Sequence, residues 1–173
     1  MASIVLVGYR GSGKTTVGNL LAQRLGMSFI DTDAMIAKAG GVTIRDIFKC
    51  IGQPYFQELE MEALEEALAM LDAVIATGGG IVMRSENRER LKKAGRPVVY
   101  LASDPNLLYS RIQGDTNSAA NRPNLTSFAD GLDEVRHVLA IRDPLYREVA
   151  TAVVDVTLLT PEQIVQQILQ QVE

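Results

Sequence analysis

The 173-residue sequence predicts an α/β fold with three layers, in which helices cover both faces of a parallel sheet. Two observations predict this fold class. Short runs rich in β-branched residues alternate with longer runs of helical character, as in repeated strand–helix units. Several short runs are apolar almost throughout, which is typical of strands that are buried on both faces. Repeats and linker-like segments are absent from the sequence, so we expect a single domain over residues 1–173.

The first predicted strand is an apolar run that ends at Gly8, and four similar runs follow it. The predicted strands are residues 3–7, 27–31, 73–77, 97–102 and 151–157. The predicted helices are residues 14–25, 53–71, 85–94, 104–113, 131–149 and 161–172. Thr160 before Pro161 is a typical helix start, with an N-cap followed by proline at the first helical position. Thr43 with Asp46 three residues later resembles a capping box, and it predicts a short helix to about Cys50.

Composition and charge exclude several classes of protein. The net charge is −4 and the sequence pI is about 5.1, which argues against nucleic acid or an anionic membrane as the main partner. The sequence has neither an apolar run of about 18 residues, the length that spans a bilayer, nor a secretory signal. Cys50 is the only cysteine, which excludes an internal disulfide and fits a reducing compartment. We therefore expect a cytoplasmic protein.

Residues 8–15 match the phosphate-loop pattern G-x-x-x-x-G-K-S/T, between a predicted buried strand and a predicted helix. Glycines let consecutive N–H groups wrap around phosphates, and the helix that follows adds the positive end of its dipole. Lys14 can reach the terminal phosphates, and the Thr15 hydroxyl can bind Mg²⁺. The predicted ligands of the nucleotide are Gly11, Ser12, Gly13, Lys14, Thr15 and Thr16. This loop predicts binding of a nucleoside triphosphate, but switches, motors and small-molecule kinases all share it.

Two further groups follow predicted strands and should lie at the same edge of the sheet. Asp31 and Asp33 follow the second predicted strand, and the glycines at 78–80 follow the third. Ligands of open α/β sheets bind at this edge. One aspartate can hold magnesium through water while the other accepts a proton from an attacking hydroxyl group. The alternative for Asp33 is the N-cap of the next helix, and the alternative for the glycines is a plain turn.

The segment from Gly114 to Phe128 is polar, rich in small residues and without strand or helix periodicity. Loops of this length inside compact domains are uncommon and often cover an active site. We therefore predict a flexible lid at about residues 114–128. The alternative is a tolerated surface insertion.

In combination, these motifs resemble the shikimate kinases, over essentially the whole chain. The motifs are residues 8–15, residues 31–33, residues 44–48 with Gly52 and Phe56, residues 77–80, Arg122 with Pro123, and residues 142–146. The resemblance implies a five-stranded parallel sheet in the order 2-3-1-4-5 and an acceptor-binding helical region at about residues 33–62. It also implies that ATP phosphorylates the 3-hydroxyl of shikimate, which yields 3-phosphoshikimate and ADP.

The resemblance assigns roles to individual residues. Asp33 would hold the shikimate hydroxyls and act as the base, Asp31 would fix Mg²⁺ through water, and Gly79 and Gly80 would line the acceptor pocket. Arg122 in the lid would stabilise the charge that develops during transfer, together with Lys14. Arg142 would bind the acceptor carboxylate, and Arg111 would stack on adenine.

The sequence departs from the family at Gln57, where shikimate kinases carry an arginine that binds the shikimate carboxylate. Gln57 donates hydrogen bonds without charge, so the change costs on the order of 1–3 kcal/mol of acceptor binding. Arg142 remains, and Arg45 or Arg10 can compensate from nearby. Two alternatives follow: a kinase for another small hydroxylated acid such as gluconate, or a nucleotide-binding regulatory protein without catalysis. We expect a monomer.

Overall fold

The computed structural model describes residues 2–115 and 131–172, and its strands form one parallel sheet. The strands are β1 (Ile4–Val7), β2 (Ser28–Asp31), β3 (Ala73–Ala76), β4 (Val98–Ala102) and β5 (Ala152–Asp155). In the described part of the chain, the five strands are ordered β2-β3-β1-β4-β5. The predicted fold class and the strand order implied by the resemblance are confirmed. Every strand is shorter than predicted, by up to three residues.

The predicted helices are all present, and their ends lie within two residues of the prediction. The helices are α1 (Lys14–Leu25), α2 (Thr32–Gly40), α3 (Ile44–Cys50), α4 (Gln53–Ala69), α5 (Ser85–Lys93), α6 (Pro105–Gly114), α8 (Gly131–Val149) and α9 (Pro161–Val172), with a short 3₁₀ turn η1 (Ile81–Met83) before α5. Thr43 caps α3 by accepting a hydrogen bond from Asp46 N (3.2 Å), as predicted. Within residues 2–115 and 131–172, the helices lack the combination of length and apolar character needed to cross a bilayer.

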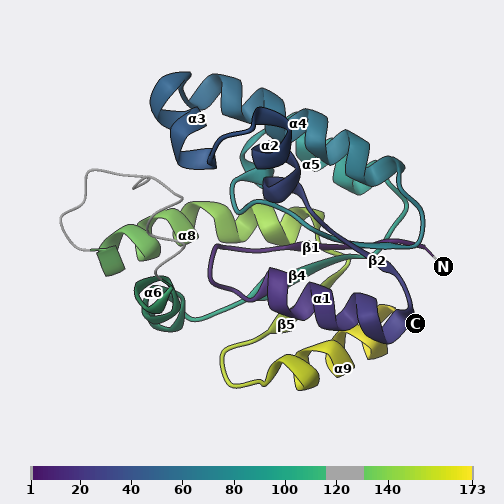
Figure 1. Cartoon of the computed structure of the whole chain (residues 1–173). Coiled ribbons are helices and arrows are strands. Elements are labelled where there is room, and N and C mark those ends of the chain that lie inside the picture. The colour runs from purple at the N-terminus through teal and green to yellow at the C-terminus, as the bar shows by residue number, and fades with distance from the viewer. Residues whose placement is uncertain (1, 116–130, 173) are drawn as a thin grey trace.

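The sheet is buried between two layers of helices, as Figure 1 shows for α1 and α9 on one side and α8 on the other. Side chains of β1 alternate between the two sides because successive residues of a strand point in opposite directions. Ile4 and Leu6 pack in a cluster with residues of α1 and α9. Val5 and Val7 pack in a second cluster with residues of α4, α5 and α8, among them Tyr146. Burial on both faces explains the unbroken apolar character of this run.

The strand order brings the predicted functional segments together. Strands β2, β3 and β1 are neighbours and run parallel, so their carboxyl ends lie side by side at one edge of the sheet. The Asp31–Asp33 segment, the glycine turn at residues 78–80 and the phosphate loop at residues 8–15 follow these three ends. Helices α2, α3 and α4, which contain the predicted acceptor-binding region, are grouped above this half of the sheet in Figure 1.

Candidate active site

The loop between β1 and α1 has a backbone that favours glycine at three positions, since Gly8, Gly11 and Gly13 all have positive φ. Gly8 has φ +152°, and a Cβ atom there would lie 2.9 Å from both Leu101 O and Ser12 Oγ. Gly13 has φ +96° and forms the N-cap position of α1. Side chains rarely adopt such conformations, so the glycines set the tight path of the loop around the start of the helix.

Polar groups of this loop are arranged to receive an anion. Lys14 is 9% exposed, and its ammonium group donates to Gly8 O (2.7 Å) and Tyr9 O (2.9 Å). Ser12 Oγ is buried, and it has no hydrogen-bond partner among the described residues. The first N–H groups of α1 point to the same place, where a helix offers its positive end. A phosphate chain fits this set of donors.

The cleft beside the phosphate loop, which we call the nucleotide cleft, combines these donors with an apolar wall. Arg111 lines the cleft and holds the loop, because its Nη1 donates to Gly11 O at 3.1 Å. The other described residues of the cleft are Arg10, Gly11, Ser12, Gly13, Lys14, Thr15, Thr16, Val17, Asp31, Asp33, Ala34, Ala37, Thr43, Ile44, Ala76, Thr77, Asp115, Leu159, Pro161 and Ile164. All the phosphate-loop residues predicted to bind nucleotide therefore line one cleft.

Asp31 and Thr15 form a pair in this cleft. Thr15 Oγ1 donates to Asp31 Oδ2 (3.2 Å), while Asp31 Oδ1 accepts from the N–H groups of Asp33 (3.0 Å) and Ala34 (3.2 Å). Asp31 is therefore the N-cap of α2, and the alternative prediction of Asp33 as N-cap is wrong. Strand β2 ends at Asp31 and α2 begins at the next residue, so only the Asp31 carboxylate reaches the first free N–H groups.

A second pocket, the acceptor pocket, lies next to the nucleotide cleft. Its described lining residues are Arg10, Asp33, Ile44, Phe48, Gln53, Phe56, Gln57, Glu60, Gly79, Gly80, Met83 and Arg142. The structure thus brings together the five residues predicted to bind the acceptor: Asp33, Gln57, Gly79, Gly80 and Arg142. Arg10, Asp33 and Ile44 line both pockets, so the two spaces meet beside these side chains. Arg45 is exposed and is not among the described residues that line either pocket.

The glycine turn makes room for the polar groups of the acceptor pocket. A Cβ atom on Gly78 would lie 2.5 Å from Asp33 Oδ1 and 3.1 Å from Glu60 Oε1. A Cβ atom on Gly80 would lie 3.6 Å from Arg142 Nη2. Glu60 is 5% exposed, and no role was predicted for it from the sequence. Its position one helical turn after the buried Phe56 was the available signal, because residues four apart share a face of the helix.

Two guanidinium groups give the acceptor pocket positive charge. The Arg142 guanidinium carbon lies 5.9 Å from the centre of the Tyr9 ring, within cation–π range. Arg10 Nη2 lies 4.0 Å from Glu134 Oε2 on α8, and both side chains are largely buried. Burial raises the pKa of the Tyr9 hydroxyl, although Arg10 and Arg142 act in the opposite direction. The pocket also contains the carboxyl groups of Asp33 and Glu60, so its two guanidinium groups suit one anionic group of an otherwise polar acceptor.

Arg122 lies outside the described residues, as does the predicted lid from residue 116 onward. Gly114 and Asp115, which the lid prediction included, belong to the end of α6: Gly114 is its last residue and Asp115 its C-cap.

Comparison with known proteins identifies close relatives. The family model for shikimate kinase matches residues 10–173. The shikimate kinase of Dechloromonas aromatica is 45% identical over 98% of this chain and 89% of its own length. A solved structure of shikimate kinase from Acinetobacter baumannii in complex with shikimate has a TM-score of 0.90 at 39% identity, and the match covers 98% of this chain and 92% of that chain.

A gluconokinase from Sinorhizobium meliloti also matches in structure, with a TM-score of 0.63 at 20% identity over 99% of this chain and 91% of that chain. At this identity the likeness shows the fold alone. The comparisons therefore favour the predicted shikimate kinase over the gluconate alternative and over a protein without catalysis. The chain belongs to the shikimate kinase family.

Proposed function

We propose that this chain transfers the terminal phosphoryl group of ATP to the 3-hydroxyl of shikimate and releases ADP and 3-phosphoshikimate. The observation that carries this proposal is the junction of the two pockets at Arg10 and Asp33. An acceptor hydroxyl beside Asp33 faces the end of a phosphate chain held by the loop at residues 8–15. Membership of the shikimate kinase family supports the same reaction.

Asp33 is the proposed base. Its carboxylate lies at the boundary of the two pockets and is only 9% exposed. The acceptor hydroxyl gives its proton to Asp33, its oxygen forms a bond to the γ-phosphorus, and the bond from that phosphorus to the bridging oxygen breaks. Lys14 and the loop N–H groups stabilise the negative charge on the phosphoryl oxygens. Arg122 joins them in this proposal on the resemblance of its motif.

Arg142 and Arg10 are the proposed partners of the shikimate carboxylate. Both line the acceptor pocket, and a planar guanidinium binds a carboxylate through two parallel hydrogen bonds. Gln57 lines the same pocket at half burial and adds a neutral hydrogen bond. Arg10 is therefore the better candidate to offset the missing family arginine, because Arg45 is exposed. Gly79 and Gly80 complete the pocket with bare backbone.

Thr15 and Asp31 are the proposed magnesium pair, the first as a direct ligand and the second through water. Among the described residues, groups of three His, Cys, Asp or Glu that could hold a metal without help are absent. The hydroxyl of Thr15 and the carboxylate of Asp31 fit Mg²⁺, which keeps several waters and binds through one or two protein oxygens together with substrate phosphates. When bound, the ion neutralises charge on the phosphate chain. Thr16 and Arg111 are the proposed contacts of the nucleoside.

Both pockets are built from the residues of a single chain, so we propose that a monomer is active. Constant specific activity over a hundredfold range of enzyme concentration would support this, and a rise with concentration would contradict it.

A coupled ADP-release assay with shikimate, gluconate or no added acceptor tests the proposed reaction. We expect turnover with shikimate only, and ADP release that is independent of shikimate would contradict the proposal. The role of Asp33 is tested with Asp33→Asn, which should lose transfer while ATP binding changes less than about threefold. Asp133→Asn on the exposed side of α8 is the control and should keep full activity. Loss of ATP binding in Asp33→Asn would show that Asp33 has a structural role instead.

A further inference from the structure

A buried tyrosine lies behind the glycine turn of the acceptor pocket. Tyr146 on α8 is fully buried, and its hydroxyl donates a hydrogen bond to the carbonyl oxygen of Gly79. Its ring stacks on Tyr100 of β4, with 4.9 Å between ring centres, and the Tyr100 hydroxyl donates to Asp143 Oδ1 (2.8 Å). Burial raises the pKa of the Tyr146 hydroxyl far above its ordinary value, so it stays a protonated donor at neutral pH.

The bond to Gly79 sets the direction of the next N–H group. The Gly79 carbonyl and the Gly80 N–H belong to one planar trans peptide, so they point in opposite directions. When Tyr146 holds the carbonyl in the interior, the Gly80 N–H points away from Tyr146. Gly80 lines the acceptor pocket, and its N–H donates to no acceptor found among the described residues. This leaves the Gly80 N–H as an oriented donor at the lining of the acceptor pocket.

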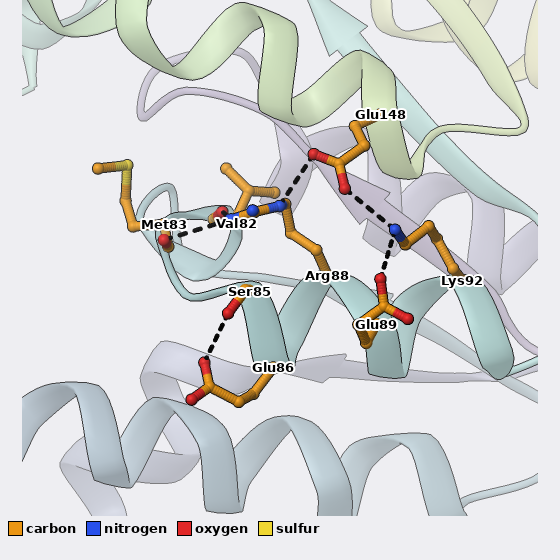
Figure 2. Close-up of polar contacts among 8 residues, drawn as sticks. All are labelled: Val82, Met83, Ser85, Glu86, Arg88, Glu89, Lys92 and Glu148. Carbon is orange, nitrogen blue, oxygen red and sulfur yellow. Dashed lines mark hydrogen bonds and ion pairs between the residues drawn. The ribbon is translucent and has the colours of Figure 1, made fainter.

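The segment after Gly80 is held by residues of α5, as Figure 2 shows in part. Arg88 Nη1 donates to Val82 O (2.8 Å) in η1, and Arg88 Nε pairs with Glu148 Oε2 on α8 (3.0 Å). Asn87 Nδ2 donates to Ile81 O (3.1 Å) from within the core. With η1 held in this way, the peptide between Gly79 and Gly80 has little freedom to turn once Tyr146 holds its carbonyl.

We propose that Tyr146 is a positioning residue for the acceptor: through the Gly79 carbonyl it directs the Gly80 N–H to donate a hydrogen bond to an oxygen of shikimate. The inference rests on the proposed function for the identity of the acceptor. Tyr146 lies one helical turn after Arg142, so α8 carries both a cation of the pocket and the group that orients the glycine turn.

A matched pair of variants tests the proposal. Tyr146→Phe and Tyr100→Phe each remove one buried hydroxyl and keep the stacked rings. Tyr146→Phe should raise the KM for shikimate by about 3- to 10-fold, the worth of one hydrogen bond, and leave the KM for ATP within twofold. Tyr100→Phe should leave both KM values within twofold of wild type. Equal rises in both variants, or no rise in Tyr146→Phe, would overturn the proposal.

A second measurement separates this inference from the proposed function. In ¹⁵N-labelled protein without substrate, Tyr146→Phe should shift the Gly80 amide resonance and speed its exchange with solvent, whereas Tyr100→Phe should change neither. In the wild type, addition of shikimate alone should move the Gly80 amide proton downfield. A Gly80 amide that responds to neither change would refute the positioning role. Absence of wild-type turnover with shikimate would refute the proposed function and leave the comparison of the two variants valid.

Discussion

Replacement of Gly78 by alanine tests how closely the reaction depends on the position of Asp33. A Cβ atom at this residue would lie 2.5 Å from Asp33 Oδ1 and 3.1 Å from Glu60 Oε1, whereas ordinary contacts begin near 3.4 Å. The Asp33 carboxylate must therefore move by about 1 Å, since its backbone is held at the start of α2 by Asp31. Gly78 does not have a positive φ, so the backbone itself accepts alanine.

The expected cost follows from this displacement. A shift of about 1 Å in a reacting group lowers catalysis by about 100-fold, which corresponds to about 2.7 kcal/mol at the transition state. We expect Gly78→Ala to lower kcat/KM for shikimate by this factor. The dissociation constant of ATP should stay within threefold of wild type, because the phosphate loop is not touched by the new methyl group.

The assay is steady-state ADP release with shikimate, together with ATP binding measured by calorimetry. Gly40→Ala at the end of α2 is the control, because its Cβ would meet Ile47 Cδ1 at an ordinary 3.4 Å. It should retain wild-type kinetics. A folded Gly78→Ala enzyme with kcat/KM within threefold of wild type would refute the reasoning, since Asp33 would then tolerate displacement.

Three further predictions concern binding and stability. Gln57→Arg should lower the KM for shikimate by about 5- to 10-fold through a charge-assisted bond, and an unchanged or higher KM would mean that residue 57 does not face the carboxylate. Asp31→Asn should raise the Mg²⁺ concentration needed for half-maximal activity by about tenfold. The Tm should stay unchanged, since asparagine caps helices as well as aspartate does, and a large fall in Tm would contradict this prediction. Burial raises the pKa of Asp143, but hydrogen bonds from Arg147 and Tyr100 outweigh it and hold this pKa below its ordinary value. The Asp143 carboxylate therefore stabilises the fold above about pH 4, and this stabilisation is lost as the pH falls. Urea unfolding of Asp143→Asn should show a deficit at pH 7 that shrinks towards pH 2, and a deficit that grows on acidification would show the wrong sign.

Local patterns in the sequence were sufficient for most elements of the fold. Buried strands produce apolar runs, and the capping residues Thr43 and Thr160 mark helix starts: Gln163 N donates to Thr160 Oγ1 (3.3 Å), as an N-cap requires. Strand ends were predicted too long because hydrogen bonding continues past the regular ladder. Thr77, for example, follows β3 and still donates from its N–H to Leu6 O (3.1 Å). The strand order came from the resemblance, because periodicity carries no information about which strands pair.

The parts of the site that the sequence did not predict depend on contacts between distant residues. The hydrogen bond from Tyr146 to Gly79 spans 67 residues, and the approach of Glu60 to the glycine turn depends on how α4 packs over the sheet. The error at Asp33 had a local cause. Two aspartates lay within three residues of a helix start, and although the predicted strand ended at Asp31, as β2 does, the pattern did not decide which carboxylate accepts from the first N–H groups of α2.

Helix α8 connects the two pockets to each other. Glu134 near its start lies 4.0 Å from Arg10 of the phosphate loop, Arg142 lines the acceptor pocket, and Tyr146 holds Gly79. These three side chains lie along one side of the helix, two turns and one turn apart. Transfer requires the acceptor oxygen and the phosphorus to approach within about 3–3.5 Å in a fixed direction. A single helix contacts both the phosphate loop and the glycine turn, so their separation depends on the position of this helix. Changes at Glu134, Arg142 or Tyr146 of α8 should therefore alter acceptor affinity and turnover together, whereas changes at the apolar wall of the nucleotide cleft should alter only the affinity for ATP.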